Sequence, residues 1–181
     1  MTKSKTRQDC ELAEYKFATM LNVLHATINS PKMLMVGCAG NPITHNGKPG
    51  LDHPELFKRY ELTTMDFDAK WNPDVVGDIT HPPHGSMDRF DLIHITQVIE
   101  HIPNLFDVAD GLNMLLNTGG YVIVDSPWGP KGPDYHGEKP SFGDYWRISK
   151  DGMVALFEDQ FEIIEIVDTD ANTSCLMRVK E

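Results

Sequence analysis

The sequence predicts an α/β domain built on a seven-stranded, mostly parallel sheet with helices on both faces and a C-terminal antiparallel hairpin. Short apolar runs bounded by glycine and polar residues alternate with stretches of helical periodicity, which is the pattern of a parallel sheet with crossover helices. The last two candidate strands have only a short turn between them, which favours a hairpin. The length of 181 residues suits one domain over 1–181. The expected fold is therefore Rossmann-like.

An N-terminal helix is predicted over residues 1–30. Apolar residues recur there at spacings of three, four and seven, which places them on one stripe of a helix. These residues are Ala13, Phe17, Met20, Leu21, Leu24 and Ile28. Ser30 precedes Pro31, and a residue before proline is disfavoured in the α region, so the helix is expected to end there.

The strands are read from short apolar or alternating runs. Met33–Val36 is wholly apolar and stops at Gly37, as expected for a strand buried on both faces of a sheet. Further strands are predicted at Leu62–Asp66, Asp74–Gly77, Asp91–Thr96 and Tyr121–Asp125. Phe161–Val167 and Thr173–Lys180 form the predicted hairpin around the turn Asp168–Asn172.

Three further helices are predicted from periodicity and capping residues. The first covers Leu105–Asn117, with Asn104 as its expected cap and Gly119-Gly120 as its expected end. The second begins at Ser149 and runs to about Glu158. A shorter helix is expected at about Pro54–Tyr60, after a long irregular stretch.

Composition indicates a soluble protein of the cytoplasm. The hydrophobic fraction of 40% and the charged fraction of 24% are ordinary, and no apolar run reaches the roughly 20 residues that a membrane span needs. Met1–Cys10 is polar and lacks the apolar core of a secretory signal. The three cysteines form no Cys-x-x-Cys pair, which favours reduced thiols over a disulfide framework.

Charge argues against one class of partner. Asp and Glu number 27 against 16 Lys and Arg, for a net charge of −11. Proteins that bind long nucleic acids neutralise phosphates with a surplus of Lys and Arg. Long nucleic acid is therefore not expected as a substrate.

Polar residues at the predicted strand ends suggest a nucleoside site, because open sheets of this kind bind ligands at the carboxyl ends of their strands. The turn from Gly37 to Gly40 would let the backbone approach a ligand closely. Asp66 could accept both hydroxyls of a ribose, with Asp68 as a rival, and Asp78 could accept from an adenine amine. Either acid alone is also explained as a turn residue, but together with the glycine turn they favour a nucleoside.

Two segments resemble a known family. Phe90–His101 and Leu115–Val124 are similar to the "FDLV…VLEH" and "LKPGG" phrases of the class I S-adenosylmethionine-dependent methyltransferases, in particular their small type 11 group. Asp144-Tyr-Trp-Arg147 resembles a further stretch seen in some of these enzymes. The resemblance implies S-adenosyl-L-methionine as cofactor. It places Gly37, Cys38, Ala39 and Gly40 against the methionine part, Asp66 and Phe67 at the ribose, Asp78 and Ile79 at the adenine, and Thr96 and Gln97 beside the sulfonium.

The glycine motif departs from the family pattern Asp-x-Gly-x-Gly-x-Gly. The acid is replaced by Met35, the second glycine by Ala39 and the third by Asn41. Two alternatives to an active methyltransferase therefore stay open. One is a degenerate cofactor-binding protein with a regulatory or structural role. The other is a different nucleotide-using enzyme, such as a dehydrogenase, although the sequence has no complete Gly-x-Gly-x-x-Gly motif.

Candidate residues on the acceptor side come from the end of the fourth strand and from a long loop. His101 has a side chain suited to a general base, and Tyr145 and Arg147 lie at the end of the 127–147 loop, which also carries Tyr135 and His136. The expected acceptor is a small molecule, a sugar or a lipid-linked intermediate, and a homodimer stays open. No metal is expected, because the pair in His81-Pro-Pro-His84 has no Cys ligands nearby.

Overall fold

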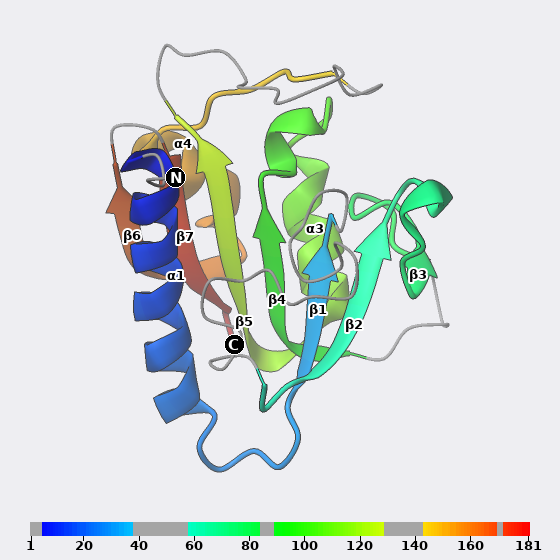
Figure 1. Cartoon of the computed structure of the whole chain (residues 1–181), viewed down its shortest axis with the longest axis vertical. Coiled ribbons are helices and arrows are strands. Elements are labelled where there is room, and N and C mark those ends of the chain that lie inside the picture. Colours follow the sequence, from blue (N-terminus) through cyan, green and yellow to red (C-terminus); the bar gives the residue numbers. More distant parts are fainter. Residues whose placement is uncertain (1–4, 38–57, 84–88, 129–142, 170–171) are drawn as a thin grey trace.

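The structure of the chain is a computed structural model, and it describes residues 5–37, 58–83, 89–128, 143–169 and 172–181. Seven strands form one sheet in the order β3-β2-β1-β4-β5-β7-β6 (Figure 1). The strands are β1 (Lys32–Val36), β2 (Glu61–Asp66), β3 (Val75–Val76), β4 (Phe90–Thr96), β5 (Leu116–Pro127), β6 (Phe161–Asp168) and β7 (Asn172–Val179). The helices are α1 (Lys5–Leu24), α3 (Asp107–Leu115) and α4 (Lys150–Phe157), with short 3-10 turns η2 (Ala69–Trp71) and η3 (Ile99–His101).

The strand directions confirm the predicted sheet. Strands β1 to β5 pair in parallel, and β7 lies antiparallel between β5 and β6. The chain moves outward from β1 through β2 to β3 and then returns to β4 on the other side of β1. This reversal next to β1 is the position at which sheets of this type bind their ligands.

Helices cover both faces of the sheet, as predicted. Met33 and Met35 of β1 pack with α1 residues in one apolar cluster, whereas Leu34 and Val36 pack with α3 and α4 residues in the other. Figure 1 shows α1 in front of the sheet and α3 and α4 behind it. The alternation along β1 is that of a strand buried on both faces.

The N-terminal helix ends earlier than residue 30. Helix α1 stops at Leu24, and Leu24 and Ile28 are 47% and 38% exposed rather than part of the core stripe. The guanidinium of Arg59 donates to the backbone carbonyls of Asn22, His25 and Ile28 and so caps this end of the helix. The predicted end at Ser30-Pro31 was wrong because the cap comes from a residue far away in the sequence.

Helix α3 and strand β5 meet without an intervening loop. The helix ends at Leu115 rather than at Asn117, and β5 begins at Leu116, so Gly119 lies inside the strand. The register with β4 is irregular here, and Gly119 takes φ +72° in the irregular part of the ladder. The predicted helix-ending role of Gly119-Gly120 was therefore wrong, although the left-handed conformation occurs at Gly119.

The capping predictions had different outcomes. Ser149 caps α4, since its side-chain oxygen accepts the N–H of Gly152 at 3.2 Å. Helix α3 has Phe106 at its cap position without a side-chain hydrogen bond, and Asn104 instead donates from its side chain to the Asp107 carboxylate.

One further predicted strand is shorter in the structure, and one predicted helix lies mostly outside the described residues. Strand β3 comprises only Val75–Val76, shorter than the predicted Asp74–Gly77. Of the predicted helix Pro54–Tyr60, only Lys58–Tyr60 belongs to the described residues, and these form a turn. Within the described ranges, no helix is both long enough and apolar enough to span a bilayer.

Candidate cofactor-binding site

The turn after β1 requires glycine at position 37. Gly37 takes φ +79°, in the left-handed region that residues with a Cβ rarely adopt. A Cβ built there would lie 2.1 Å from Cγ2 of Val98. The N–H of Gly37 donates to the carbonyl of Met65 at 2.8 Å. The space beside Val98 at the end of β1 therefore accommodates backbone atoms but no side chain.

Asp66 presents a buried carboxylate at the end of β2. It is 3% exposed, and its Oδ1 accepts the N–H of Asp68 at 3.0 Å. Asp68, the rival acid, caps η2 through the N–H of Lys70 and forms an ion pair with the Lys70 ammonium. Only Asp66 of these two acids lines the cavity described below.

The end of β3 brings a second acid to the same place. The Oδ1 of Asp78 accepts from both the N–H and the hydroxyl of Thr80, at 2.9 and 2.8 Å, so this carboxylate also orders its own turn. Ile79 is buried, and its carbonyl packs against Gly111 of α3 so closely that a Cβ on Gly111 would lie 1.7 Å from the oxygen. The position of the Asp78–Ile79 turn therefore depends on a glycine in a helix behind the sheet.

The turn after β4 is held from β5. Gln97 takes φ +55°, its N–H donates to the carbonyl of Asp125 at 2.9 Å, and its side-chain amide donates to the Asp125 carboxylate at 2.6 Å. The hydroxyl of Ser174 on β7 donates to the other carboxylate oxygen. The buried Asp125 thus fixes an unfavourable backbone conformation that directs the chain from β4 into η3.

These strand ends surround one cavity of about 390 Å³. Its size is in the range of cofactor and small-molecule sites. The described residues that line it include no Lys or Arg, and its only acids are Asp66 and Asp78. The lining consists of Val36, Gly37, Asp66, Phe67, Gly77, Asp78, Ile79, Gln97, Val98, His101, Ile102, Pro103, Gly143 and Tyr145.

Most of the site residues predicted from the sequence are brought together here. Those in the lining are Gly37, Asp66, Phe67, Asp78, Ile79, Gln97, His101 and Tyr145. Thr96 is not among the lining residues, and its hydroxyl lies 3.3 Å from Nε2 of the buried His94. Arg147 is also outside the lining. Cys38, Ala39, Gly40, Tyr135 and His136 lie outside the described residues.

His101 is held in one tautomer at the cavity wall. Its Nδ1 lies 2.7 Å from the carbonyl oxygen of Gly143. Because a carbonyl oxygen only accepts, Nδ1 carries the hydrogen, and in the neutral ring Nε2 carries the lone pair. The side chain is 20% exposed. The geometry therefore gives the ring a basic nitrogen in a partly buried position.

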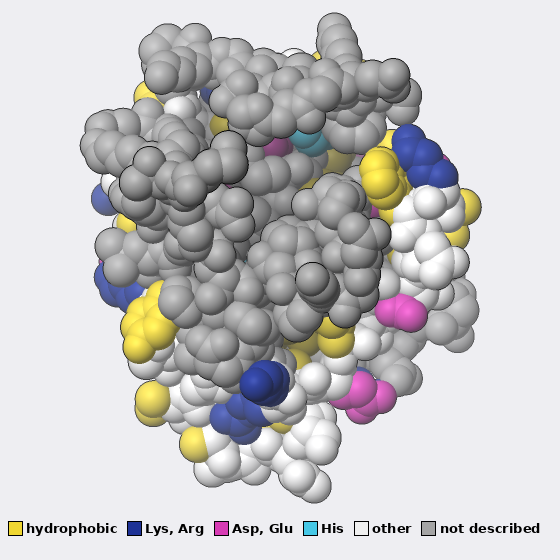
Figure 2. Space-filling view, viewed as in Figure 1, with side chains coloured by type: hydrophobic (Ala, Val, Ile, Leu, Met, Phe, Trp, Pro, Cys, Tyr) yellow, Lys and Arg dark blue, Asp and Glu magenta, His cyan; other side chains and the backbone are white. Residues whose placement is uncertain are grey.

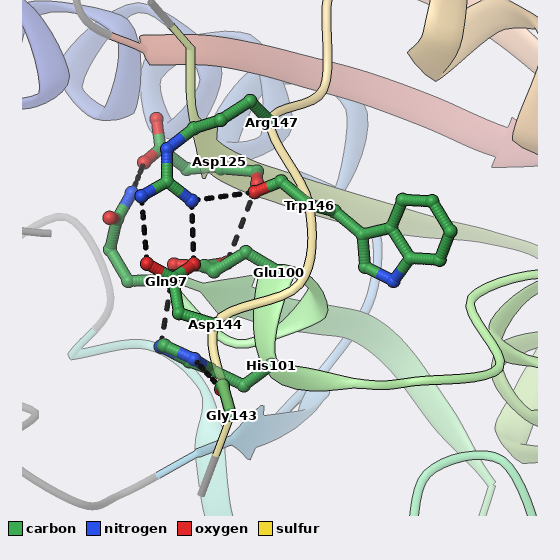
Figure 3. Close-up of polar contacts among 9 residues, drawn as sticks. Gln97, Glu100, His101, Asp125, Gly143, Asp144, Trp146 and Arg147 are labelled. Atoms are coloured by element: carbon green, nitrogen blue, oxygen red, sulfur yellow. Dashed lines mark hydrogen bonds and ion pairs between the residues drawn. The ribbon is translucent and has the colours of Figure 1, made fainter. Parts of the chain in front are cut away.

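The segment Gly143–Ser149 crosses the carboxyl end of the sheet on its way to α4 (Figure 1, yellow to orange). The N–H groups of Tyr145 and Trp146 donate to the carbonyl of Glu100, at 2.8 and 3.3 Å, and the indole N–H of Trp146 donates to the carbonyl of Ile102 at 2.9 Å. Arg147 makes a two-pronged ion pair with Asp144, at 2.6 and 2.7 Å (Figure 3). In this geometry Arg147 stabilises the segment that carries Tyr145.

Glu100 is the site residue that the sequence analysis missed. It is 2% exposed, and its carboxyl lies 3.8 Å from Nε2 of His101 (Figure 3). The hydroxyl of Ser126 lies 3.4 Å from the same carboxyl. Burial raises the pKa of Glu100 to about 8, and the charges of Asp125 and Asp144 act in the same direction. The available signal was a charged residue inside the apolar run Val98–Ile102.

The fold and the cavity define the class of protein: it is an α/β protein with a Rossmann-like ligand site where the strand order reverses. By sequence, no protein-family model and no curated protein matches the chain.

Solved structures identify the fold more closely. An S-adenosylmethionine-dependent methyltransferase from Clostridium acetobutylicum aligns over 94% of this chain and 92% of its own, with 12% identity and a TM-score of 0.65. The N-methyltransferase NodS from Bradyrhizobium japonicum, in complex with S-adenosylhomocysteine, aligns over 93% and 88%, with 14% identity and a TM-score of 0.59. A 1,6-didemethyltoxoflavin-N1-methyltransferase from Burkholderia thailandensis aligns over 100% and 92%, with 14% identity and a TM-score of 0.57. The chain has the fold of the class I S-adenosylmethionine-dependent methyltransferases.

Proposed function

We propose that this protein binds S-adenosylmethionine in the cavity and transfers its methyl group to a small-molecule acceptor. The observation that carries the proposal is the meeting of Gly37, Asp66 and Asp78, from the ends of three strands, around a cavity of about 390 Å³. The structural neighbours are methyltransferases, and two of them hold S-adenosylhomocysteine.

The residues present fit this cofactor. The buried Asp66 carboxylate is suited to accept hydrogen bonds from a pair of ribose hydroxyls. The lack of a side chain at Gly37, where a Cβ would meet Val98, suits close contact between the cofactor and the backbone. In the proposal Asp78 and Ile79 receive the adenine, and Gln97 lies nearer the methionine part. Phe67 follows Asp66, lines the cavity and is 60% exposed, and in the proposal its ring covers the nucleoside. Cys38, Ala39 and Gly40 would continue the turn from Gly37.

The charge of the cavity supports a cationic cofactor over a dinucleotide. Its described lining holds two carboxylates and no Lys or Arg. A sulfonium is positively charged, whereas the pyrophosphate of NAD is negative and gains most from cationic partners. Among the described residues on the face in Figure 2, Lys and Arg side chains lie in small separate groups. Together with the net charge of −11, this supports the expectation that long nucleic acid is not a substrate.

On the acceptor side, the proposal assigns a general base to His101 and a flanking aromatic ring to Tyr145. When bound, the cofactor supplies a methyl group on a sulfonium, open to displacement by a nucleophile. His101 would accept the proton that a hydroxyl or amine acceptor releases, through the nitrogen that is not bonded to Gly143. Tyr145, 54% exposed at the cavity, would flank the acceptor, and Arg147 would hold the segment that carries Tyr145.

Calorimetry tests the cofactor directly. We expect S-adenosylmethionine and S-adenosylhomocysteine to bind and NAD not to bind. Binding of NAD alone would refute the proposal. Binding of the cofactor without formation of S-adenosylhomocysteine, over a panel of small amines, phenols and sugars, would favour the degenerate cofactor-binding alternative.

The placement of the ribose is tested by removing one carboxylate at a time. Asp66→Ala should weaken S-adenosylhomocysteine binding by roughly 1–3 kcal/mol, because two ribose hydroxyls lose their acceptor. Asp68→Ala is the matched control, since Asp68 is two residues away and pairs with Lys70 outside the cavity. Equal affinities for both variants in calorimetry would contradict the placement.

A further inference from the structure

Glu100 and His101 are consecutive residues of η3 with opposite surroundings. His101 lines the cavity, whereas the Glu100 side chain is turned into the protein and is 2% exposed. Their side chains nevertheless approach each other, with Oε1 of Glu100 3.8 Å from Nε2 of His101. A buried carboxyl therefore lies beside the nitrogen to which the proposed function assigns proton transfer.

We propose that Glu100 is a positioning residue for His101: its buried carboxyl lies beside Nε2 of the imidazole and, when ionised, stabilises the protonated ring. The role of His101 as the base rests on the proposed function. The coupling between the two side chains does not, and it can be measured in the protein without cofactor or acceptor.

The surroundings of the carboxyl favour its protonated form. The negative charges nearby are Asp125 on β5 and Asp144 on the Gly143–Ser149 segment, and the cation of Arg147 is engaged with Asp144. The hydroxyl of Ser126, on β5, is the polar side chain that donates to it, at 3.4 Å. Burial raises the pKa of Glu100 to about 8, so the carboxyl is mostly neutral at pH 7.

The backbone carbonyl of Glu100 helps to position the hydrogen-bond partner of Nδ1, the other nitrogen of the imidazole. Its carbonyl accepts from the N–H groups of Tyr145 and Trp146, which fastens the incoming segment to η3. That fastening brings the carbonyl of Gly143 to Nδ1 of His101 at 2.7 Å. One residue thus both fixes the tautomer of the ring and places a titratable group at its second nitrogen.

The charge of Glu100 changes the basicity of His101. A neutral carboxyl at 3.8 Å offers the imidazolium no compensating charge, whereas a carboxylate at that distance in a buried site attracts it strongly. Ionisation of Glu100, whose pKa is about 8, should therefore stabilise the protonated ring of His101. The rate of proton transfer in the proposed reaction would respond in the same range.

Nuclear magnetic resonance of the full chain, labelled with ¹³C at glutamate and histidine side chains, tests the coupling. In the unaltered protein, the Glu100 carboxyl carbon should titrate near pH 8, and the His101 ring resonances should show a step at the same pH. Glu100→Gln should abolish the His101 step while keeping the side-chain volume. Glu165→Gln, which removes a surface carboxylate paired with Lys16, is the control and should leave both titrations unchanged.

Two further variants should move the step in opposite directions. Ser126→Ala removes a hydrogen bond that favours the carboxylate, so the step should move to higher pH. Asp144→Asn removes a negative charge and releases Arg147, so the step should move to lower pH. A Glu100 carbon that titrates near the ordinary pKa of 4.5, or a His101 step that persists in Glu100→Gln, would overturn the inference. Coupled titrations in a protein that transfers no methyl group over the acceptor panel would leave the inference standing and favour the degenerate cofactor-binding alternative to the proposed function.

Discussion

Three buried carboxyl groups near the carboxyl ends of the strands are stabilised in three ways. Asp66 accepts a backbone N–H from its own turn. Asp125 accepts from the side chains of Gln97 and Ser174. Glu100 accepts from its own backbone N–H and, at 3.4 Å, from the hydroxyl of Ser126, and burial raises its pKa to about 8. For Glu100, the cost of burying a charge outweighs these hydrogen bonds and raises the pKa of the carboxyl.

At the scale of the residue, the buried Glu100 makes stability depend on pH. Its pKa is about 8 in the folded protein and near the ordinary 4.5 in the unfolded chain, so the folded state binds more protons between these values. Stability from this group is therefore present at low pH and is lost as the pH rises from about 4.5 to about 8. Glu100→Gln should remove this loss, and the variant should gain on the unaltered protein by several kcal/mol over that window.

Chemical denaturation at pH 5, 7 and 9 measures the effect. The relevant quantity is the difference in unfolding free energy between Glu100→Gln and the unaltered protein, since other groups titrate in both. A difference that stays constant from pH 5 to pH 9 would show that the carboxyl ionises normally in the folded state.

At the scale of the element, α3 sets the position of the Asp78–Ile79 turn. The contact is made by Gly111, where any side chain would meet the Ile79 carbonyl. Similarly, Arg59 determines the end of α1, because its guanidinium donates hydrogen bonds to carbonyls of the last helical turn and of the residues beyond it. Both elements are shaped by contacts with segments more than 30 residues away.

Replacement of Gly111 tests the packing of α3. Gly111→Ala places a Cβ 1.7 Å from the Ile79 oxygen, so either the helix or the turn must move. We expect a loss of stability of roughly 1–3 kcal/mol or more, despite the better helix propensity of alanine. We also expect weaker cofactor binding, because the turn bearing Asp78 is displaced. Thermal unfolding and calorimetry measure the two effects.

Gly152 of α4 is the matched control. An added Cβ there meets only side-chain atoms of Ile148 and Ser149, at 3.2 and 3.5 Å. Gly152→Ala should stay within about 1 kcal/mol of the unaltered protein, because helix propensity offsets the close contact. Equal losses in the two variants would mean that Gly111 has no special packing role.

At the scale of the whole molecule, the fold is completed by its last strand. Strand β7 lies inside the sheet between β5 and β6, and residues 172–177 are all buried. Its side chains enter both apolar clusters, Leu176 on the face of α1 and Met177 on the face of α3 and α4. Strand β7 therefore contributes to the apolar clusters on both faces of the sheet.

Deletion of residues 172–181 should abolish cooperative unfolding. Without β7, β6 has no neighbour and β5 becomes an open edge with its apolar side chains exposed. Thermal melts followed by circular dichroism measure this, with deletion of Lys180 and Glu181 alone as the control, since both are exposed. A cooperative melt in the longer deletion would show that β1 to β5 with their helices form a core on their own.

The sequence by itself determined the features that depend on neighbouring residues. The apolar runs at Met33–Val36 and Asp91–Thr96 predict buried strands because the period of side chains along a strand is local. The cap at Ser149 and the acids at the ends of β2 and β3 could be located for the same reason. The alternation of strands and helices then predicts a mostly parallel sheet.

Only the tertiary structure decided the features that depend on distant segments. It placed Asp66 rather than Asp68 at the cavity, turned Thr96 toward His94 and ended α1 with Arg59. It also buried Glu100 beside His101. The physical reason is that exposure and hydrogen-bond partners, which determine the charge of a carboxyl and the end of a helix, arise only when strands and loops far apart in the chain come together.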